Sequence, residues 1–275
     1  MICAVPLIAA DDESRFGGKA VSLGRSIQAG LPVPPGFAFD VHAVDALAAK
    51  GAADENLADL LGAVGGRAAV RSSAVGEDAR DASFAGQHLT ILNAASSAGL
   101  LHAIVEVWRS AHSASALLYR ERMGIAGTPR IAVVIQHLVD AGAAGVLFTR
   151  NPASGAREIL IEAAWGLGES VVSGAVVPDS YRISLDGQVL ERAAGIKDVE
   201  LRISPHGGTV EIAVEAPRAY ALVLQDSQLE RLHALTLRCE AIFGEDLDIE
   251  WAFEDDVLYM LQCRAITSAA APSRA

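Results

Sequence analysis

The stretch Asp248-Ile-Glu-Trp-Ala-Phe-Glu-Asp-Asp-Val-Leu-Tyr-Met-Leu-Gln-Cys-Arg264 contains two strand-like runs on either side of a pair of acidic residues. Because side chains alternate between the faces of a strand, Glu250 shares a face with Asp248, and Gln262 shares one with Arg264. Burying half of these groups would be costly, so we expect an antiparallel hairpin with all four on one face. Pairing Glu250 with Gln262 predicts a three-residue loop, 255–257. A two-residue loop would place them on opposite faces.

This polar face is suited to magnesium and phosphate. Magnesium takes oxygen ligands, such as those of Glu250 and Gln262, and usually lets substrate phosphates complete its shell. The guanidinium of Arg264 is able to bind a phosphate through two N–H groups. The alternative reading of the same residues is a surface hairpin held together by salt bridges.

The composition predicts a folded, acidic protein of the cytoplasm. The 275 residues are 51% hydrophobic and 20% charged, enough for one large domain or two lobes. The net charge of −12 argues against a nucleic-acid partner. The three cysteines are far apart, which favours a reducing compartment. We expect neither a signal peptide nor a membrane helix, because no apolar run reaches about 18 residues.

Periodicity and turn residues divide the chain into helices and strands. The expected helices are one that stops at Gly30, then 41–63, 98–123, and a last one that begins with the capping box Ser227-Gln-Leu-Glu230 and ends at Gly244. The expected strands are 36–39, 68–71, 131–135, 145–148, 159–161 and the two of the final hairpin. The three apolar runs between 131 and 161 are predicted to lie in one sheet.

Two further segments offer cations to a phosphate. Lys19 follows Gly17 and Gly18, so it is able to approach a phosphate closely, although no Walker A sequence is present. Arg71 ends a strand and precedes two serines and a glycine-bearing loop that reaches Gly86. The alternatives are a solvated lysine at a helix start and an ordinary surface loop.

The segment Trp165-Gly-Leu-Gly-Glu-Ser170 is not a dinucleotide-binding turn. Its glycines do not complete G-x-G-x-x-G, because Val171 stands where the third glycine belongs. Glu162 and Glu169 flank the segment, and the residues alone leave a site role and a structural role equally open.

Taken together, these segments resemble the N-terminal ATP-binding module of the phosphoenolpyruvate synthase and pyruvate phosphate dikinase family, which also includes rifampin phosphotransferase. The matching stretches follow the family's order and cover nearly the whole chain: Gly17-Gly-Lys-Ala-Val-Ser-Leu-Gly24, Ala29-Gly-Leu-Pro-Val-Pro-Pro-Gly-Phe37, Ala69-Val-Arg-Ser-Ser-Ala74, Asp81-Ala-Ser-Phe-Ala-Gly-Gln87, Gly145-Val-Leu-Phe-Thr-Arg-Asn-Pro152, Ile161-Glu-Ala-Ala-Trp-Gly-Leu-Gly-Glu169, Asp248-Ile-Glu-Trp-Ala252 and Leu258-Tyr-Met-Leu-Gln-Cys-Arg264. The chain departs from the family in a shortened N-terminal lobe and in Ala265, where a proline is usual.

The resemblance implies an α+β fold of the ATP-grasp type, with ATP bound between two lobes. It places a shortened N-terminal lobe at 1–128, a C-terminal lobe with the magnesium site at 129–267, and a flexible tail at 268–275. Adenine and ribose would be held by a hinge, which comprises Gln136, His137 and Val139.

The same resemblance implies roles around the phosphates. Lys19 and Arg71 would be the nucleotide-phosphate cations, and Gly86 and Thr90 would belong to a loop that covers the phosphates. Arg264 would contact the γ-phosphate or the transition state. For the metal, the resemblance implies Mg²⁺ held by the two oxygen side chains of the hairpin, Glu250 and Gln262.

Full-length relatives continue into a phosphohistidine domain and, in the dikinases, a pyruvate-binding barrel. We therefore expect a stand-alone phosphotransferase that uses ATP and Mg²⁺ to phosphorylate a histidine on a separate partner protein. One alternative is a kinase that phosphorylates a small-molecule metabolite directly. Another is a nucleotide-binding or regulatory module without catalysis.

Overall fold

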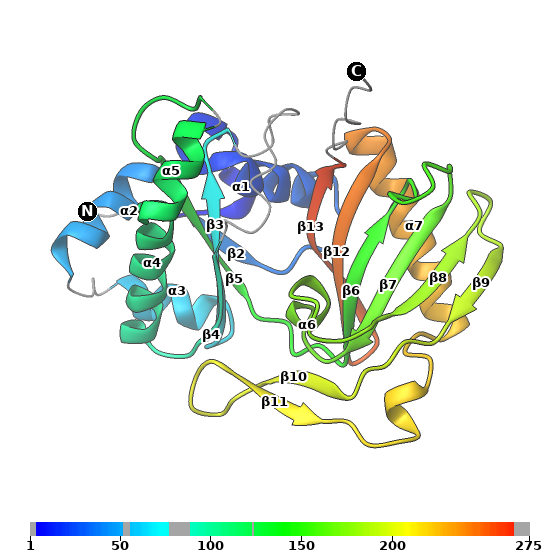
Figure 1. The fold of residues 1–275 in the computed structure, drawn as a ribbon. Helices are drawn as coiled ribbons and strands as arrows, with labels where there is room; N and C mark the ends of the chain where they lie inside the picture. The colour runs from blue at the N-terminus through cyan, green and yellow to red at the C-terminus, as the bar shows by residue number, and fades with distance from the viewer. Residues whose placement is uncertain (1–3, 52–55, 77–88, 123, 267–275) are drawn as a thin grey trace.

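Two antiparallel sheets form two lobes (Figure 1). The computed structural model describes residues 4–51, 56–76, 89–122 and 124–266. The first sheet has the strand order β1 (Ala4–Pro6), β2 (Gly36–Phe39), β5 (Ile131–His137), β3 (Ala68–Ala74) and β4 (Thr90–Ala94). The second has the order β13 (Val257–Ala265), β12 (Leu247–Glu254), β6 (Ala143–Phe148), β7 (Ile159–Trp165), β8 (Asp179–Ile183) and β9 (Val189–Ala193). A separate hairpin consists of β10 (Val199–Ile203) and β11 (Thr209–Ala213).

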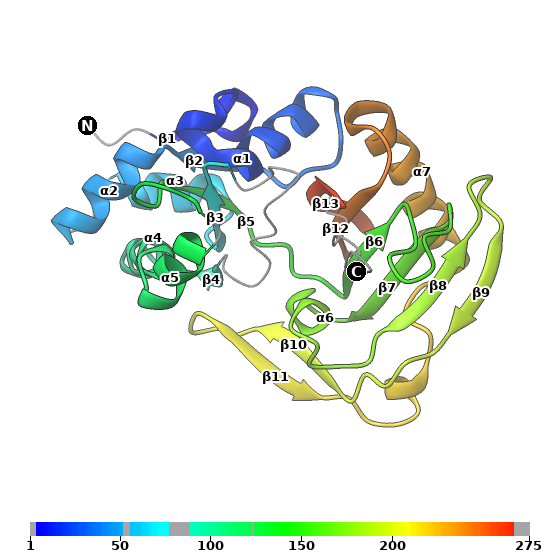
Figure 2. The ribbon, with the colours of Figure 1, turned by 45° about the horizontal axis from the view of Figure 1, so that its top comes forward.

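Helices bury the sheets in two large apolar cores. In the first core, α2 (Val41–Lys50), α3 (Asn56–Ala63) and α4 (Ser97–Ala111) pack on the first sheet. In the second core, α7 (Asp226–Phe243) packs on the second sheet. α1 (Glu13–Gln28) joins this second core although it precedes β2 in the chain, so it links the lobes (Figure 2). The remaining helical elements are short: η1 (Leu7–Ala9), α5 (Ala114–Arg122), α6 (Glu169–Val172) and η2 (Arg218–Tyr220).

The two long helices predicted in the first lobe are each broken. The prediction of one helix over 41–63 is wrong, because Gly51 takes a left-handed φ of 61° and ends α2. The prediction of one helix over 98–123 is wrong as well, since α4 ends at Ala111 and α5 begins at Ala114. The first prediction rested on an alanine-rich composition and the second on apolar periodicity, and neither signal marks a break.

The last helix begins earlier than its predicted capping box. Gln225 has extended backbone angles, and its N–H donates to Oε1 of Gln228 at 3.0 Å, so α7 starts at Asp226. The predicted box at Ser227-Gln-Leu-Glu230 is therefore displaced toward the N-terminus by two residues. The predicted end at Gly244 is confirmed, and this glycine has a φ of 89°.

The three apolar strands between 131 and 161 do not share one sheet, so that prediction is wrong. β5 pairs with β2 and β3 in the first sheet, whereas β6 and β7 pair with each other in the second. An apolar run indicates a buried strand, but it carries no information about the neighbouring strand. We propose that the lobes divide after His137 rather than at residue 128. The predicted tail, 268–275, lies outside the described residues.

The final hairpin confirms the predicted pairing but not the predicted loop. Glu250 lies opposite Gln262, and Asp248 lies opposite Arg264. The loop has two residues, 255–256, and both have the positive φ that a type I′ turn requires. A β-bulge next to Glu250 adds one residue to β13 and restores the common face. The prediction that a two-residue loop would separate Glu250 from Gln262 is therefore wrong.

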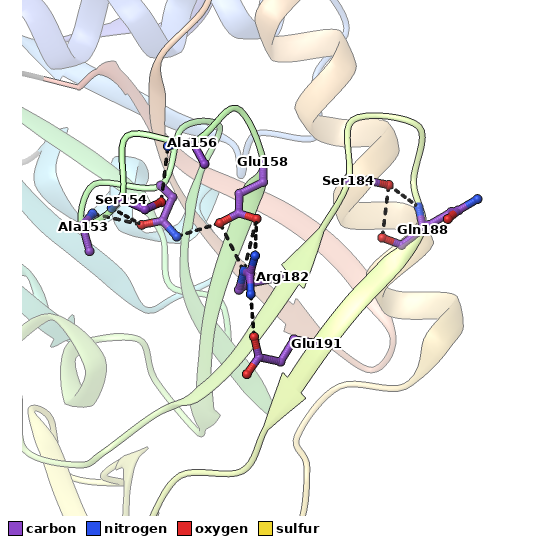
Figure 3. A network of polar contacts seen from close by, with 9 residues as sticks. Ala153, Ser154, Ala156, Glu158, Arg182, Ser184, Gln188 and Glu191 are labelled. Carbon is purple, nitrogen blue, oxygen red and sulfur yellow. Dashed lines mark hydrogen bonds and ion pairs between the residues drawn. The ribbon is translucent and has the colours of Figure 1, made fainter.

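A polar cluster fixes the outer strands of the second sheet (Figure 3). Glu158 is buried and accepts a hydrogen bond from Asn151 at 2.8 Å and another from Arg182 at 2.9 Å. Arg182 also donates to Glu191 on β9 at 2.7 Å. The hydrogen bonds from Arg182 and Asn151 hold the pKa of Glu158 below its ordinary value. The cluster therefore ties the loop before β7 to β8 and β9.

Within the described part of the chain, no helix combines the length and the apolar character that a membrane span requires.

Candidate active site

A cavity of about 310 Å³ lies between the two sheets, a size within the range of small-ligand pockets. Both lobes contribute to its wall. The larger apolar side chains of the wall are Leu89, Leu92, Leu138, Val139, Leu167, Val172, Trp251 and Leu261. Its polar side chains are Arg71, Thr90, Gln136, His137, Glu169, Ser173 and Glu250.

Arg71 connects the two lobes at one end of this cavity. Its guanidinium forms an ion pair with Glu250 and donates to Oε1 of Gln262 at 3.0 Å. It also donates to the carbonyl of Leu261, which is the extra residue of the β13 bulge. The bulge thus offers the guanidinium a backbone acceptor next to Gln262. Arg71 itself is only 7% exposed.

Lys19 reaches the same end of the cavity because α1 is kinked. Gly17 has a φ of 74°, and an added Cβ would collide with the carbonyl of Ser73. The kink lets α1 pack directly on β3, where Nζ of Lys19 donates to the carbonyl of Ser72 at 2.9 Å. Since Ser72 follows Arg71 in β3, the two predicted phosphate cations lie close together.

The charges around the hairpin keep Glu250 ionised. Burial opposes ionisation most strongly, but the combined fields of Arg71, Lys19 and Arg264 outweigh it and hold the pKa of Glu250 below its ordinary value. Its neighbour Asp248 behaves differently. Burial raises the pKa of Asp248, although the guanidinium of Arg264 lies 2.7 Å away. Of these two carboxyl groups, only that of Glu250 therefore has a lowered pKa.

The end of β5 and the segment that leads to β6 form the apolar end of the cavity. Nε2 of Gln136 donates to the carbonyl of Pro34 at 3.1 Å, and Nδ1 of His137 lies 2.9 Å from the carbonyl of Val64. Val139 is 4% exposed. The side chains of this segment are thus anchored, and apolar groups surround them, as a flat aromatic ligand would require.

The structure brings most of the predicted residues together. Six of them line the cavity: Arg71, Thr90, Gln136, His137, Val139 and Glu250. Gln262 and Lys19 lie beside Arg71, whereas Arg264 pairs with Asp248 away from the wall. Gly86 lies outside the described residues.

The two glutamates that flank the glycine segment, Glu162 and Glu169, differ in their position relative to the cavity. Glu169 lines the cavity and Glu162 does not, and burial raises the pKa of both. The sequence reasoning missed the leucines of the apolar wall. Leu92 and Leu261 belong to it because each lies at a β-bulge, and neither bulge has a signal in the sequence.

The oxygen side chains fit magnesium in type but supply few ligands. Across the described ranges, no group of three or more His, Cys, Asp or Glu side chains is arranged to hold a metal ion. Glu250 and Gln262 offer two hard oxygen donors on adjacent strands. Magnesium commonly has one or two protein ligands and takes the others from phosphates and water, so this pair fits a metal that arrives with a nucleotide.

The family described as "Pyruvate phosphate dikinase, AMP/ATP-binding domain" matches residues 57–274. The chain belongs to this family. Its two-lobed architecture confirms the α+β class that the resemblance implied.

Three relatives illustrate the range of this AMP/ATP-binding family. The prodigiosin synthesizing transferase PigC of Serratia marcescens is 37% identical over 94% of this chain and 32% of its own length. A rifampicin phosphotransferase of Streptomyces sviceus is 43% identical over 73% of the chain and 23% of its own length. A probable phosphoenolpyruvate synthase of Methanothermobacter thermautotrophicus is 34% identical over 94% of the chain and 45% of its own length. The chain thus spans less than half of each relative.

Proposed function

We propose that this chain is an ATP-dependent phosphotransferase that binds Mg-ATP in the cavity between its lobes. The observation that carries this proposal is the meeting of Arg71 with Glu250 and Gln262 at one end of an apolar cavity. Positioned cations and an ionised carboxylate suit phosphoryl transfer, which depends on positioning and charge neutralisation.

In the proposed complex, the nucleotide places its base at the apolar end of the cavity and its phosphates at the charged end. The base lies among the apolar side chains near Gln136, His137 and Val139, and the phosphates extend toward Lys19 and Arg71. In this proposal Glu250 and Gln262 would hold Mg²⁺, which neutralises phosphate charge when bound. Arg264 lies two register positions beyond Gln262, where it contacts the terminal phosphate after releasing Asp248.

The acceptor is proposed to be a histidine on a partner protein or on a separate domain. Support comes from the family, because relatives include a probable phosphoenolpyruvate synthase of more than twice this length. A small molecule is the second candidate, because another relative is a rifampicin phosphotransferase. We further propose that the protein acts in the cytoplasm.

Product analysis tests the proposed activity. The pure protein is incubated with Mg²⁺ and ATP labelled at the β- or γ-phosphate, alone and with a histidine-domain protein or a metabolite extract from the same source. AMP and phosphate indicate dikinase-type transfer, whereas ADP indicates a simple kinase. Absence of turnover with every acceptor would contradict the proposal and favour a nucleotide-binding module.

Arg71→Ala is expected to strengthen metal binding in the absence of nucleotide. The guanidinium of Arg71 occupies both Glu250 and Gln262, so a divalent cation must displace it. Removing this internal cation frees both oxygens, and we expect Mn²⁺, a spectroscopic substitute for Mg²⁺, to bind about tenfold more tightly, a change of ~1.4 kcal/mol. ATP binding should weaken in the same variant, because a phosphate cation is lost.

Arg15→Ala is the matched control for this experiment. Arg15 also forms an ion pair, with Asp40, but its side chain is 53% exposed and lies outside the cavity wall. Mn²⁺ affinity, measured by electron paramagnetic resonance, should match the wild type. Equal Mn²⁺ affinity in Arg71→Ala and the wild type would show that Glu250 and Gln262 are not the metal ligands.

A further inference from the structure

The β10–β11 hairpin connects the two lobes beside the cavity. It leaves the second lobe and runs beneath both lobes toward the end of β4, as Figure 1 shows. The hairpin belongs to neither main sheet. It contacts the second lobe through an isolated β-bridge between Gly166 and Leu201 and through the hydrogen bonds described below.

Asn93 attaches the hairpin to the first lobe. Its Nδ2 donates to the carbonyl of Ser204 at 2.7 Å and to that of Gly208 at 2.6 Å. The backbone carbonyl of Asn93 accepts from the N–H of Gly208 at 3.2 Å. We call these three hydrogen bonds the Asn93 clip. Asn93 is 2% exposed and has a φ of 61°, so its side chain is buried on the first lobe and its backbone turns sharply, whereas Gly208 on the hairpin is exposed.

A bulge in β4 aims Asn93 at the hairpin. Ala94 pairs with Ala68, whereas Ile91 pairs with Val70, so β4 has one more residue than β3 in this interval. The extra residue allows Leu92 to line the cavity while Asn93 turns away to the hairpin. The clip and the cavity wall are thus adjacent in the chain.

The other end of the hairpin is attached to the second lobe. The carbonyl of Leu201 accepts from the N–H of Leu167 at 2.9 Å, and Nη1 of Arg202 donates to the carbonyl of Ala141 at 3.1 Å. Leu167 and Ala141 both line the cavity. The attachment points Leu167 and Ala141 therefore lie in the cavity wall, and Asn93 lies one residue from Leu92 in that wall.

We propose that Asn93 is a positioning residue that clips the first lobe to the β10–β11 hairpin and thereby holds the apolar wall closed around the nucleotide base. The hairpin acts as a strap: it is fixed to Leu167 and Ala141 in one lobe and to Asn93 in the other. Releasing the clip lets the wall at Leu92 separate from the wall at Leu167, so the base binds less tightly. The inference rests on the proposed nucleotide site.

The amide group of Asn93 is required in one orientation. Both acceptors are carbonyls, so only the NH₂ group is able to face them. Among the described residues, Oδ1 of Asn93 has no hydrogen-bond partner. Asn93→Asp keeps the size of the side chain but directs a carboxylate oxygen at two carbonyl oxygens. Asn93→Gly removes the donors and suits the positive φ, so it provides a second variant that is compatible with folding.

The test combines a nucleotide-free measurement with ATP binding. In Asn93→Asp and Asn93→Gly we expect hydrogen exchange of the Gly208 amide to be about tenfold faster without nucleotide, and ATP to bind about tenfold more weakly, as for the loss of partly buried hydrogen bonds. KM for ATP should rise with kcat within about twofold of the wild type. Ser204→Ala is the control, because it removes the hydroxyl and keeps the carbonyl that Asn93 binds.

Unchanged exchange at Gly208 in both variants would overturn the clip. Faster exchange with unchanged ATP affinity would overturn the positioning role, since the hairpin would then open without effect on the base. If the wild type fails to bind ATP, the proposed function is wrong. The exchange measurement needs no nucleotide, so it still tests the clip separately.

Discussion

Glu250→Gln is expected to lower Mg²⁺-dependent ATP turnover by at least about a hundredfold, the usual effect of losing one transition-state contact. The substitution keeps the shape of the side chain and removes its charge. That charge balances Arg71 and Lys19 in the nucleotide-free protein and would bind Mg²⁺ in the complex. A neutral amide oxygen binds a hard divalent cation much more weakly than a carboxylate does.

Stability should respond far less than turnover. The amide oxygen that replaces the carboxylate at this position is still able to accept one hydrogen bond from Arg71, and the Glu250 side chain is 25% exposed. We therefore expect the free energy of unfolding, measured in urea, to fall by only about 1–2 kcal/mol. Turnover is measured over a Mg²⁺ titration in parallel.

Glu245→Gln serves as the control for this variant. Glu245 pairs with Arg157, and its side chain is 65% exposed, so neither turnover nor stability should change appreciably. Wild-type turnover in Glu250→Gln would show that the metal is held elsewhere. A loss of stability as large as the loss of turnover would instead indicate a structural role.

Lys197→Met is expected to lower the free energy of unfolding by about 3–5 kcal/mol, the typical effect of breaking a buried ion pair. Lys197 and Asp179 form an ion pair in which both side chains are fully buried. The carboxylate of Asp179 also accepts from the N–H groups of Gly195 and Val223, at 2.8 and 2.7 Å. Without the ammonium, a charged carboxylate remains in the core with two amides as its main support.

The double variant Lys197→Met, Asp179→Asn should recover part of this loss, because the uncompensated charge disappears. Arg192→Met is the surface control. Its ion pair with Asp226 is exposed, so the free energy of unfolding in urea should change by less than about 1 kcal/mol. Equal effects of Lys197→Met and Arg192→Met would mean that burial adds nothing to the interior pair.

The cavity illustrates where sequence reasoning reached its limit. Arg71, Glu250 and Gln262 were each identified as candidate site residues, and the structure brings the three side chains into contact. The leucines of the apolar wall were not identified, because a leucine that lines a cavity looks like any core leucine in a sequence. Asn93 was missed for a similar reason: its role depends on the hairpin turn near Ser204, which is more than a hundred residues away.

The sequence by itself predicted the shared polar face of the final hairpin, because burying half of its polar groups among apolar neighbours would be costly. It also determined the membership of the family, since the matching stretches are local and occur in order. The tertiary structure alone decided the two-residue loop, the bulge at Leu261 and the assignment of β5 to the first sheet. These features depend on which strands become neighbours, and that choice follows from the packing of the whole chain rather than from any local pattern.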